Sequence, residues 1–266
     1  LALVELALLQ GYAPDVLVSW QSVDDGQHYC LPVAAVGHGF IYNKRIFSEL
    51  GLAVPQTRDA FHQVLETIQA DGRYTPMTMG LADDWIATAM GLELIGPNYW
   101  HGDLGLKEAA RGVPFSSPQG EAALRELSTW PAYMEPDPFL STRLNALERF
   151  STGQVAILPT GSWDIPLLRL NPIEDYGVFA APRLRAEDPC FVTWHNDLGF
   201  AINAATDHPQ EAAAFISYLS SDEFLKPMEE HLPGFFAMRP TGSPTTNPLV
   251  NALIAAKDSC ETTQRL

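Results

Sequence analysis

Hydrophobic positions recur along the chain in two rhythms, which predict a mixture of helices and strands. At residues 60–70 the apolar side chains follow helical spacing, and Thr57 is the predicted N-cap. The apolar run at residues 154–159 predicts a buried strand instead. The same rules predict strands at residues 29–36, 39–44, 75–81, 175–180 and 191–203, and helices at residues 44–50, 85–94, 117–129, 144–151, 165–170, 209–219, 221–228 and 251–257. Because strands and helices alternate, we expect an α/β fold.

Three of these helices carry more specific expectations. Gly96 and Pro97 should end the helix at residues 85–94, because proline cannot donate the next helical hydrogen bond. In the helix at residues 117–129, Ser117 is the predicted N-cap. The side chains predicted to face inward are Ala122, Leu124 and Leu127 in that helix, and Ala212, Phe215, Ile216 and Leu219 in the helix at residues 209–219.

Composition and charge restrict what the chain can bind. Its 266 residues are 46% hydrophobic and 18% charged, as in a globular protein of one or two domains. Acidic residues outnumber basic ones by 32 to 16, so the formal charge of −16 argues against a general basic surface for nucleic acid or anionic lipid. No run of about 18 apolar residues occurs, which argues against a membrane-spanning helix.

Both ends of the chain suggest a piece of a longer protein. Residues 1–9 are apolar apart from Glu5, and they lack the basic segment and the cleavage site of a signal peptide. We therefore expect an amphipathic segment there, in a fragment that is truncated at its N- and C-termini.

Residues that carry enzyme or metal chemistry are present without the spacing that such chemistry needs. The seven histidines are dispersed, and the three cysteines are too few for a disulfide framework or a clustered zinc site, so we expect no metal and no cofactor. Phosphate-binding, serine-hydrolase and zinc-protease motifs are missing, and no catalytic residue is predicted. Whether Cys30 and Cys190 form a disulfide stays open at this level.

Tryptophans are frequent for this length, and three of the six lie beside polar side chains in loops or at the ends of elements. These are Trp85 after Asp84, Trp163 before Asp164, and Trp194 before the segment His195-Asn196-Asp197. Indole faces beside planar polar groups suit sugars, because sugar C–H faces pack on aromatic rings and sugar hydroxyl groups need hydrogen-bond partners. The pattern therefore indicates carbohydrate binding.

Three sequence blocks follow one another between residues 31 and 240. The first contains Leu31-Pro32-Val33 and Tyr42-Asn43-Lys44, followed by Phe47, Gly51-Leu52, Pro55, Thr57 and Phe61. The second is Gly153-Gln154-Val155-Ala156 leading to Gly161-Ser162-Trp163, and the third is Phe200-Ala201-Ile202-Asn203 followed by the helix that begins at Pro209. These blocks resemble the extracellular solute-binding proteins of ABC transporters, in the family that includes the maltose- and oligosaccharide-binding proteins.

The resemblance implies a two-lobed α/β fold of the type II periplasmic-binding-protein kind, with one lobe incomplete. The partial N-terminal lobe would comprise residues 1–35 and 200–245. The C-terminal lobe would comprise residues 36–199 and 246–266. Crossovers between the lobes are expected near residues 33–39 and 194–200.

The resemblance also implies a set of ligand-binding residues. Trp163 corresponds to the aromatic residue that stacks on a sugar ring in the maltose-binding branch of the family. His38 lies on one expected crossover. The remaining candidates are Trp194, His195 and Asn196 on the other crossover, and Asp84 and Trp85 in a loop that faces the cleft in relatives.

In functional terms, the resemblance implies the extracellular substrate-binding component of an ABC importer rather than an enzyme. Such a protein would bind a sugar or oligosaccharide between two hinged lobes and deliver it to the permease subunits. We expect a periplasmic or cell-surface monomer that reaches the membrane only through the permease or through a lipid anchor outside this sequence, with no nucleic acid as partner.

Two alternatives stay open. The same fold could bind a polyamine or another cationic solute through Asp84, Asp164 and Asp197, beneath the indole faces. The chain could also be an enzyme that cleaves glycosides, which requires two carboxylates held across a cleft.

Overall fold

The computed structural model describes residues 9–22, 24–102, 116–168, 175–239, 241 and 246–263. Two compact units share the chain. Unit 1 comprises Leu1–Val36 and His195–Asn247, and unit 2 comprises Gly37–Trp194 and Pro248–Leu266. The amphipathic segment expected at residues 1–9 lies outside the described residues except for Leu9, and so does the predicted end of the helix at residues 165–170.

The strands are held in one hydrogen-bonded order, β2-β3-β1-β5-β7, with β4 and β6 paired to β1 as well. Within unit 2, β3 and β4 are antiparallel to β1, whereas β2 is parallel to β3 and β7 is parallel to β5. The strand bounds are β1 (Cys30–Asn43), β2 (Thr75–Met77), β3 (Val155–Gly161), β4 (Tyr176–Phe179), β5 (Phe191–Ala201), β6 (Phe236–Ala237) and β7 (Glu261–Thr263). The α/β prediction is confirmed.

Strand β1 joins the two segments that the sequence predicts at residues 29–36 and 39–44, and it is buried along nearly all of its length. Glycine allows this burial at two points. A Cβ atom on Gly37 would lie 2.5 Å from the ring of Trp194, and one on Gly39 would lie 3.2 Å from Val178. Neighbouring side chains therefore cover β1 where it has none of its own.

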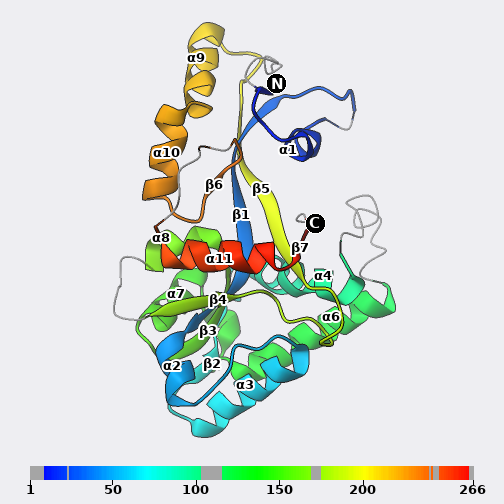
Figure 1. The fold of residues 1–266 in the computed structure, drawn as a ribbon, viewed down its shortest axis with the longest axis vertical. Helices are drawn as coiled ribbons and strands as arrows, with labels where there is room; N and C mark the ends of the chain where they lie inside the picture. The colour runs from blue at the N-terminus through cyan, green and yellow to red at the C-terminus, as the bar shows by residue number, and fades with distance from the viewer. Residues whose placement is uncertain are drawn as a thin grey trace. The chain divides into compact units, whose positions relative to one another are not determined.

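The helices of unit 2 begin at the local signals that the sequence shows. Thr57 accepts a hydrogen bond from the Ala60 amide, and Ser117 accepts one from the Gly120 amide, as predicted for N-caps. Helix α11 packs against β4 (Figure 1). The bounds are α2 (Lys44–Glu49), α3 (Arg58–Asp71), the π-helix η2 (Ala87–Leu92), α4 (Glu93–Trp100), α6 (Pro118–Thr129), α7 (Arg143–Ser151), α8 (Ile165–Leu168) and α11 (Pro248–Asp258), with the short 3₁₀ turns η3 (Trp130–Tyr133), η4 (Pro138–Leu140) and η5 (Ser162–Asp164).

The core of unit 2 forms where α3, α4, α6 and the strands bring aromatic and branched side chains together. Phe40 of β1 stacks on Phe179 of β4 with ring centroids 5.0 Å apart. Trp130 and Phe61 close around Phe40 at centroid distances of 5.9 and 5.2 Å. Burial of such large side chains supplies most of the stability of a unit this size.

Pro97 does not end a helix, so the prediction for residues 85–94 is wrong in its boundary. Helix α4 runs through Gly96 and Pro97 and ends at Trp100. Pro97 lacks the amide hydrogen that would bond to the carbonyl of Glu93, four residues earlier. The hydroxyl group of Thr193 donates to that carbonyl instead, at 2.6 Å. A tertiary hydrogen bond thus replaces the local one that proline removes.

The inward face of α6 also differs from the prediction. Leu124 is 45% exposed and Ala122 is exposed, whereas the buried positions are Gly120, Ala123 and Glu126. The carboxylate of Glu126 accepts hydrogen bonds from Arg58 at 2.6 Å and from the indole of Trp130 at 3.1 Å. A ring nitrogen of His62 lies 2.6 Å from the same carboxylate, so polar contacts set the rotation of this helix.

Unit 1 contains the short helix α1 (Pro14–Ser19), helices α9 (Pro209–Leu219) and α10 (Asp222–His231), and strand β6 against the first half of β1. Helix α10 follows α9 end to end (Figure 1), and the buried side chains of α9 are Ile216 and Leu219. Phe215 is 57% exposed, so its predicted inward position is wrong.

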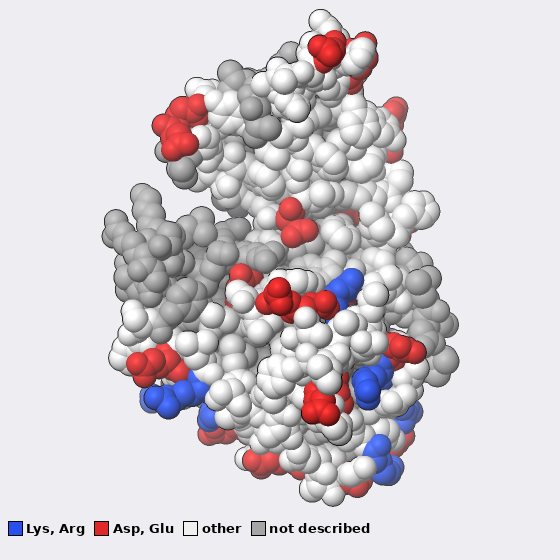
Figure 2. All heavy atoms as spheres, turned by 180° about the vertical axis from the view of Figure 1, so that it is seen from behind, with Lys and Arg blue, Asp and Glu red and all other residues white. Residues whose placement is uncertain are grey.

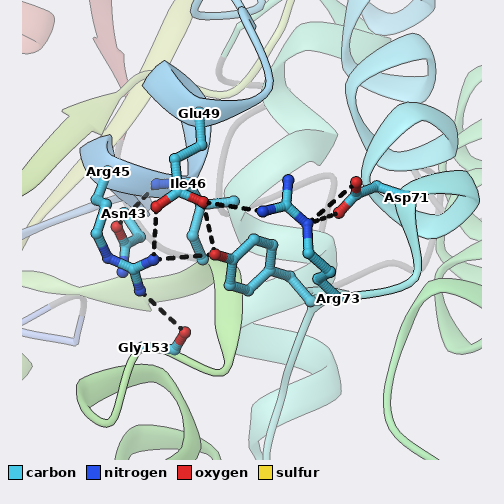
Figure 3. A network of polar contacts seen from close by, with 8 residues as sticks. Asn43, Arg45, Ile46, Glu49, Asp71, Arg73 and Gly153 are labelled. Carbon is cyan, nitrogen blue, oxygen red and sulfur yellow. Dashed lines mark hydrogen bonds and ion pairs between the residues drawn. The ribbon is translucent and has the colours of Figure 1, made fainter.

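A surface network fixes α2 against the neighbouring loops of unit 2 (Figure 3). Glu49 accepts hydrogen bonds from Arg45 at 3.0 Å and from the hydroxyl group of Tyr74 at 2.7 Å. Arg73 reaches the same carboxylate at 3.3 Å, and Arg45 also contacts the Gly153 carbonyl. Because these charges are largely exposed, each pair contributes only about 0.2–1 kcal/mol, and the network mainly orients the loops.

Cys190 and Cys260 form a disulfide, and Cys30 is a free cysteine. The pairing of β5 with β7 begins at the next residue of each strand, Phe191 opposite Glu261, which brings the two cysteines together. The question that the sequence left open, whether Cys30 pairs with Cys190, is answered in the negative.

We predict that the substitution Glu126→Gln lowers the free energy of unfolding by about 2–4 kcal/mol at neutral pH, because it leaves Arg58 without its buried anion. The control is Glu121→Gln on the same helix, whose exposed carboxylate should matter by less than about 1 kcal/mol. Urea titration of both variants measures the difference, and equal losses would contradict the role assigned to Glu126.

The pH dependence of this contribution has a definite sign. Burial alone would raise the pKa of Glu126, but the hydrogen bond from Trp130 and the charges of His62 and Arg58 hold that pKa below its usual value of 4.5. A depressed folded-state pKa stabilises the protein above the unfolded-state pKa and loses this effect as the pH falls through the folded-state pKa. The gap between the wild-type chain and Glu126→Gln should therefore shrink below about pH 4.5.

We predict that the disulfide contributes up to about 4 kcal/mol, because it closes a loop with a sequence separation of 70 residues. Thermal unfolding with and without a reductant measures this. The wild-type chain should melt at a lower temperature after reduction, the double variant Cys190→Ser/Cys260→Ser should not respond to the reductant, and Cys30→Ser should behave as the wild type.

Candidate functional site

The candidate site of unit 2 starts where strand β3 ends. Gly161 is its last residue, and the turn η5 follows directly with Ser162, Trp163 and Asp164. The indole of Trp163 lies over Gly161, where a Cβ atom would be 2.2 Å from the ring. Trp163 is half-buried and packs against the hydrophobic core, so its position is fixed from beneath.

Two further predicted residues meet Trp163. His38 of β1 lies opposite Gly161 in the strand register, and its ring is 5.4 Å from the Trp163 ring at an interplanar angle of 89°. Trp85 lies before η2, and its ring centroid is 6.0 Å from that of Trp163 at 58°. His38 is 1% exposed and Trp85 is 41% exposed. We call these three side chains the aromatic platform.

The residue after Trp163 belongs to an ion pair whose carboxylate is buried. Asp164 is 1% exposed, pairs with Arg143 of α7, and accepts a hydrogen bond from the hydroxyl group of Thr160 at 2.5 Å. Burial raises the pKa of Asp164, and Thr160 and Arg143 offset part of this rise. The carboxylate next to Trp163 is therefore already occupied by partners within unit 2.

Asp83 anchors the loop that carries Trp85 and the ligand-binding candidate Asp84. Asp83 accepts a hydrogen bond from the backbone amide of Arg143 at 2.6 Å, and it is half-buried. Asp84 is exposed beside it. The two neighbouring aspartates thus have different environments, although the sequence does not distinguish them.

Trp194 lies away from the aromatic platform. Its ring covers Gly37 on β1, and Lys257 of α11 is 5.2 Å from the ring centroid. Adjacent residues of a strand point to opposite faces, so Gly37 and His38 present opposite sides of β1. Trp194 and the platform therefore occupy different faces of this strand.

His195 and Asn196 belong to unit 1. His195 is 3% exposed, and its Nδ1 atom lies 3.2 Å from the Asn196 carbonyl. The side-chain amide of Asn196 donates to the hydroxyl group of Ser19 in α1. Among the predicted residues, Trp163 thus contacts both His38 and Trp85.

Sequence reasoning missed Arg143, Thr160 and Asp83, which support this site without belonging to the platform. Arg143 is the first residue of a helix that Thr142 caps, a position that carries no signal of a distant partner. Thr160 precedes the Gly-Ser-Trp turn and could have been chosen for its spacing of four residues from Asp164.

The chemistry of the platform is that of flat apolar faces beside fixed polar groups. Among the residues that the structure describes, no group of three or more His, Cys, Asp or Glu side chains could hold a metal ion. On the face shown in Figure 2, acidic side chains are scattered and the described basic ones form no broad patch. Such a surface suits an uncharged ligand that packs on aromatic rings.

A family profile for bacterial extracellular solute-binding proteins matches residues 3–246. The chain belongs to this family. Its members bind solutes and are not enzymes, which confirms the resemblance seen in the sequence and overturns the alternative of a glycoside-cleaving enzyme.

One curated relative of this solute-binding protein is the multiple sugar-binding protein of Streptococcus mutans serotype c, strain ATCC 700610 / UA159. The two are 29% identical over 206 residues, which is 73% of this chain and 47% of the relative. The chain thus spans about half the length of the curated relative that it matches.

Solved structures of sugar-binding proteins share the fold. A chitin oligosaccharide binding protein superposes with a TM-score of 0.85 at 22% identity, covering 98% of this chain and 65% of that one. RafE in complex with raffinose gives a TM-score of 0.82 at 22% identity, covering 99% and 70%. The predicted periplasmic-binding-protein fold is therefore confirmed.

In the part of the chain that the structure describes, no helix combines the length and apolar character needed to cross a membrane.

We predict that the substitution Gly161→Ala displaces the Trp163 indole, because the new Cβ atom would lie 2.2 Å from the ring. Acrylamide should then quench the fluorescence of this tryptophan more strongly than in the wild type. The same glycine substitution in a Trp163→Phe background serves as the control, and a change of equal size there would mean that another tryptophan responds.

Proposed function

We propose that this chain is the sugar- or oligosaccharide-binding component of an ABC importer, which delivers its ligand to permease subunits. Family membership supports solute binding, and the similarity to several sugar-binding proteins supports sugar as the solute. The aromatic platform carries the proposal within this chain, because the rings of His38 and Trp85 each lie within 6.0 Å of the Trp163 ring and support an apolar indole face beside polar side chains.

The platform suits a sugar better than a flat apolar ligand. Trp163 is fixed by Gly161 beneath it, so little conformational entropy is lost when a pyranose C–H face packs on it. The rings of His38 and Trp85, which belong to two other segments, contact the indole of Trp163 and restrict its orientation. A preorganised surface of this kind increases affinity without additional contacts.

A cationic ligand has less support, because the carboxylate nearest to Trp163 is engaged. Asp164 pairs with Arg143 and accepts from Thr160, so its charge is compensated. The other two carboxylates of that alternative, Asp84 and Asp197, are exposed, and Asp197 belongs to unit 1. An uncharged polyhydroxyl ligand needs no such charge.

Transport would follow from a change of conformation. The lobes predicted from sequence, residues 1–35 with 200–245 and residues 36–199 with 246–266, would close on the sugar between them. A ligand can drive closure only by its higher affinity for the closed state, so residues on both lobes should contribute to binding. A periplasmic or cell-surface location, with the permease as partner, completes this proposal.

We predict that the purified chain binds raffinose or a chitin oligosaccharide in isothermal titration calorimetry and does not bind spermidine. The substitution Trp163→Ala should cost roughly 2 kcal/mol of binding free energy, which is about a thirtyfold loss of affinity, because it removes the main stacking surface. The control is Phe139→Ala, which removes a ring of unit 2 that is 64% exposed and should leave affinity unchanged.

Two results would contradict the proposal. Binding of spermidine with a strong dependence on salt concentration would favour the cationic alternative. Unchanged sugar affinity in Trp163→Ala would remove the platform as the ligand-binding surface, even if the chain still bound sugar.

A further inference from the structure

Arg143 contacts both segments that carry the indoles of the aromatic platform. Its backbone amide donates to Asp83, which lies two residues before Trp85. Its guanidinium group pairs with Asp164, the residue after Trp163. Asp83 and Asp164 thus anchor the segments of Trp85 and Trp163, and both aspartates bind the same arginine.

The backbone at Arg143 packs so closely against Gly80 that only glycine fits at position 80. A Cβ atom on Gly80 would lie 2.1 Å from the amide nitrogen of Arg143 and 2.3 Å from its Cα atom. The amide of Ala82 also donates to the Ser141 carbonyl at 2.9 Å. The start of α7 is therefore held directly against the segment that leads to Trp85.

The second anchor is equally constrained. Asp164 is 1% exposed, and its two carboxylate oxygens bond to Arg143 and Thr160. Arg143 supplies the positive charge that compensates this carboxylate, and a buried carboxylate that loses its cation is strongly destabilised. Loss of Arg143 would therefore change the turn Ser162–Asp164 that holds the Trp163 indole.

We propose that Arg143 is a positioning residue that sets the geometry between the Trp85 and Trp163 rings, and thereby the affinity for sugar. It acts by fixing the two segments at the observed centroid distance of 6.0 Å and angle of 58°. The part of this proposal that concerns affinity rests on the proposed sugar-binding function.

The test uses a readout that does not depend on sugar. The electronic transitions of two indoles at this distance couple, and the coupling adds a signal to the circular dichroism spectrum. This coupled signal is the part of the wild-type spectrum that is lost both in Trp85→Phe and in Trp163→Phe. In Arg143→Met this signal should fall to less than about half, and the affinity for raffinose should fall about tenfold, since a loosened supporting shell weakens a site.

Three further variants sharpen the result. Arg143→Lys keeps the charge and should restore part of the coupled signal and part of the affinity. Asp83→Ala removes only the anchor of the Trp85 segment, so it should reduce the signal while the pair of Arg143 with Asp164 remains. Arg149→Met changes an exposed arginine in the last turn of the same helix and should alter neither quantity.

The outcomes separate this proposal from the proposed function. A coupled signal and an affinity that stay at wild-type values in Arg143→Met, while Trp163→Ala loses binding, would overturn the positioning role alone. A reduced signal in a chain that binds no sugar would support the positioning role and overturn the function. If Arg143→Met does not fold, Arg143→Lys and Asp83→Ala decide, and unchanged signals in both would overturn the positioning role.

Discussion

Asp164 places a carboxylate with 1% of its surface exposed inside unit 2, where an uncompensated charge would be strongly unfavourable. Arg143 and Thr160 compensate it, and the consequences extend to the whole candidate site. The ion pair joins α7 to the turn after β3, and this turn carries Trp163, whose ring contacts His38 of β1 and Trp85. A single buried charge thus links α7 to the end of β3 and to the turn that carries Trp163.

Polar contacts of this type recur where the fold departs from simple hydrophobic patterning. Glu126 turns α6 so that a carboxylate, rather than Leu124, faces the core. Thr193 supplies the hydrogen bond that Pro97 withholds from α4. In each case a group distant in the sequence satisfies a buried polar atom, and the cost of leaving that atom unpaired outweighs the local preference.

These contacts explain how far the sequence could predict the structure. Helix starts at Thr57 and Ser117 were predictable, because a cap and its partner lie three residues apart. The family, the fold and the candidate rings of Trp163, Trp85 and His38 could be identified from motifs and residue types. The roles of Arg143 and Asp83 could not, because they depend on an approach between segments 60 residues apart that only the folded chain displays.

The chain passes from one unit to the other three times, after Val36, Trp194 and Asn247. Neither unit is therefore a continuous stretch, and this has a consequence for synthesis. Unit 1 lacks helices α9 and α10 until residues beyond 194 have left the ribosome, and unit 2 lacks α11 and β7 until residues beyond 247 have followed. Neither unit can therefore complete its fold until part of the other unit has been synthesised.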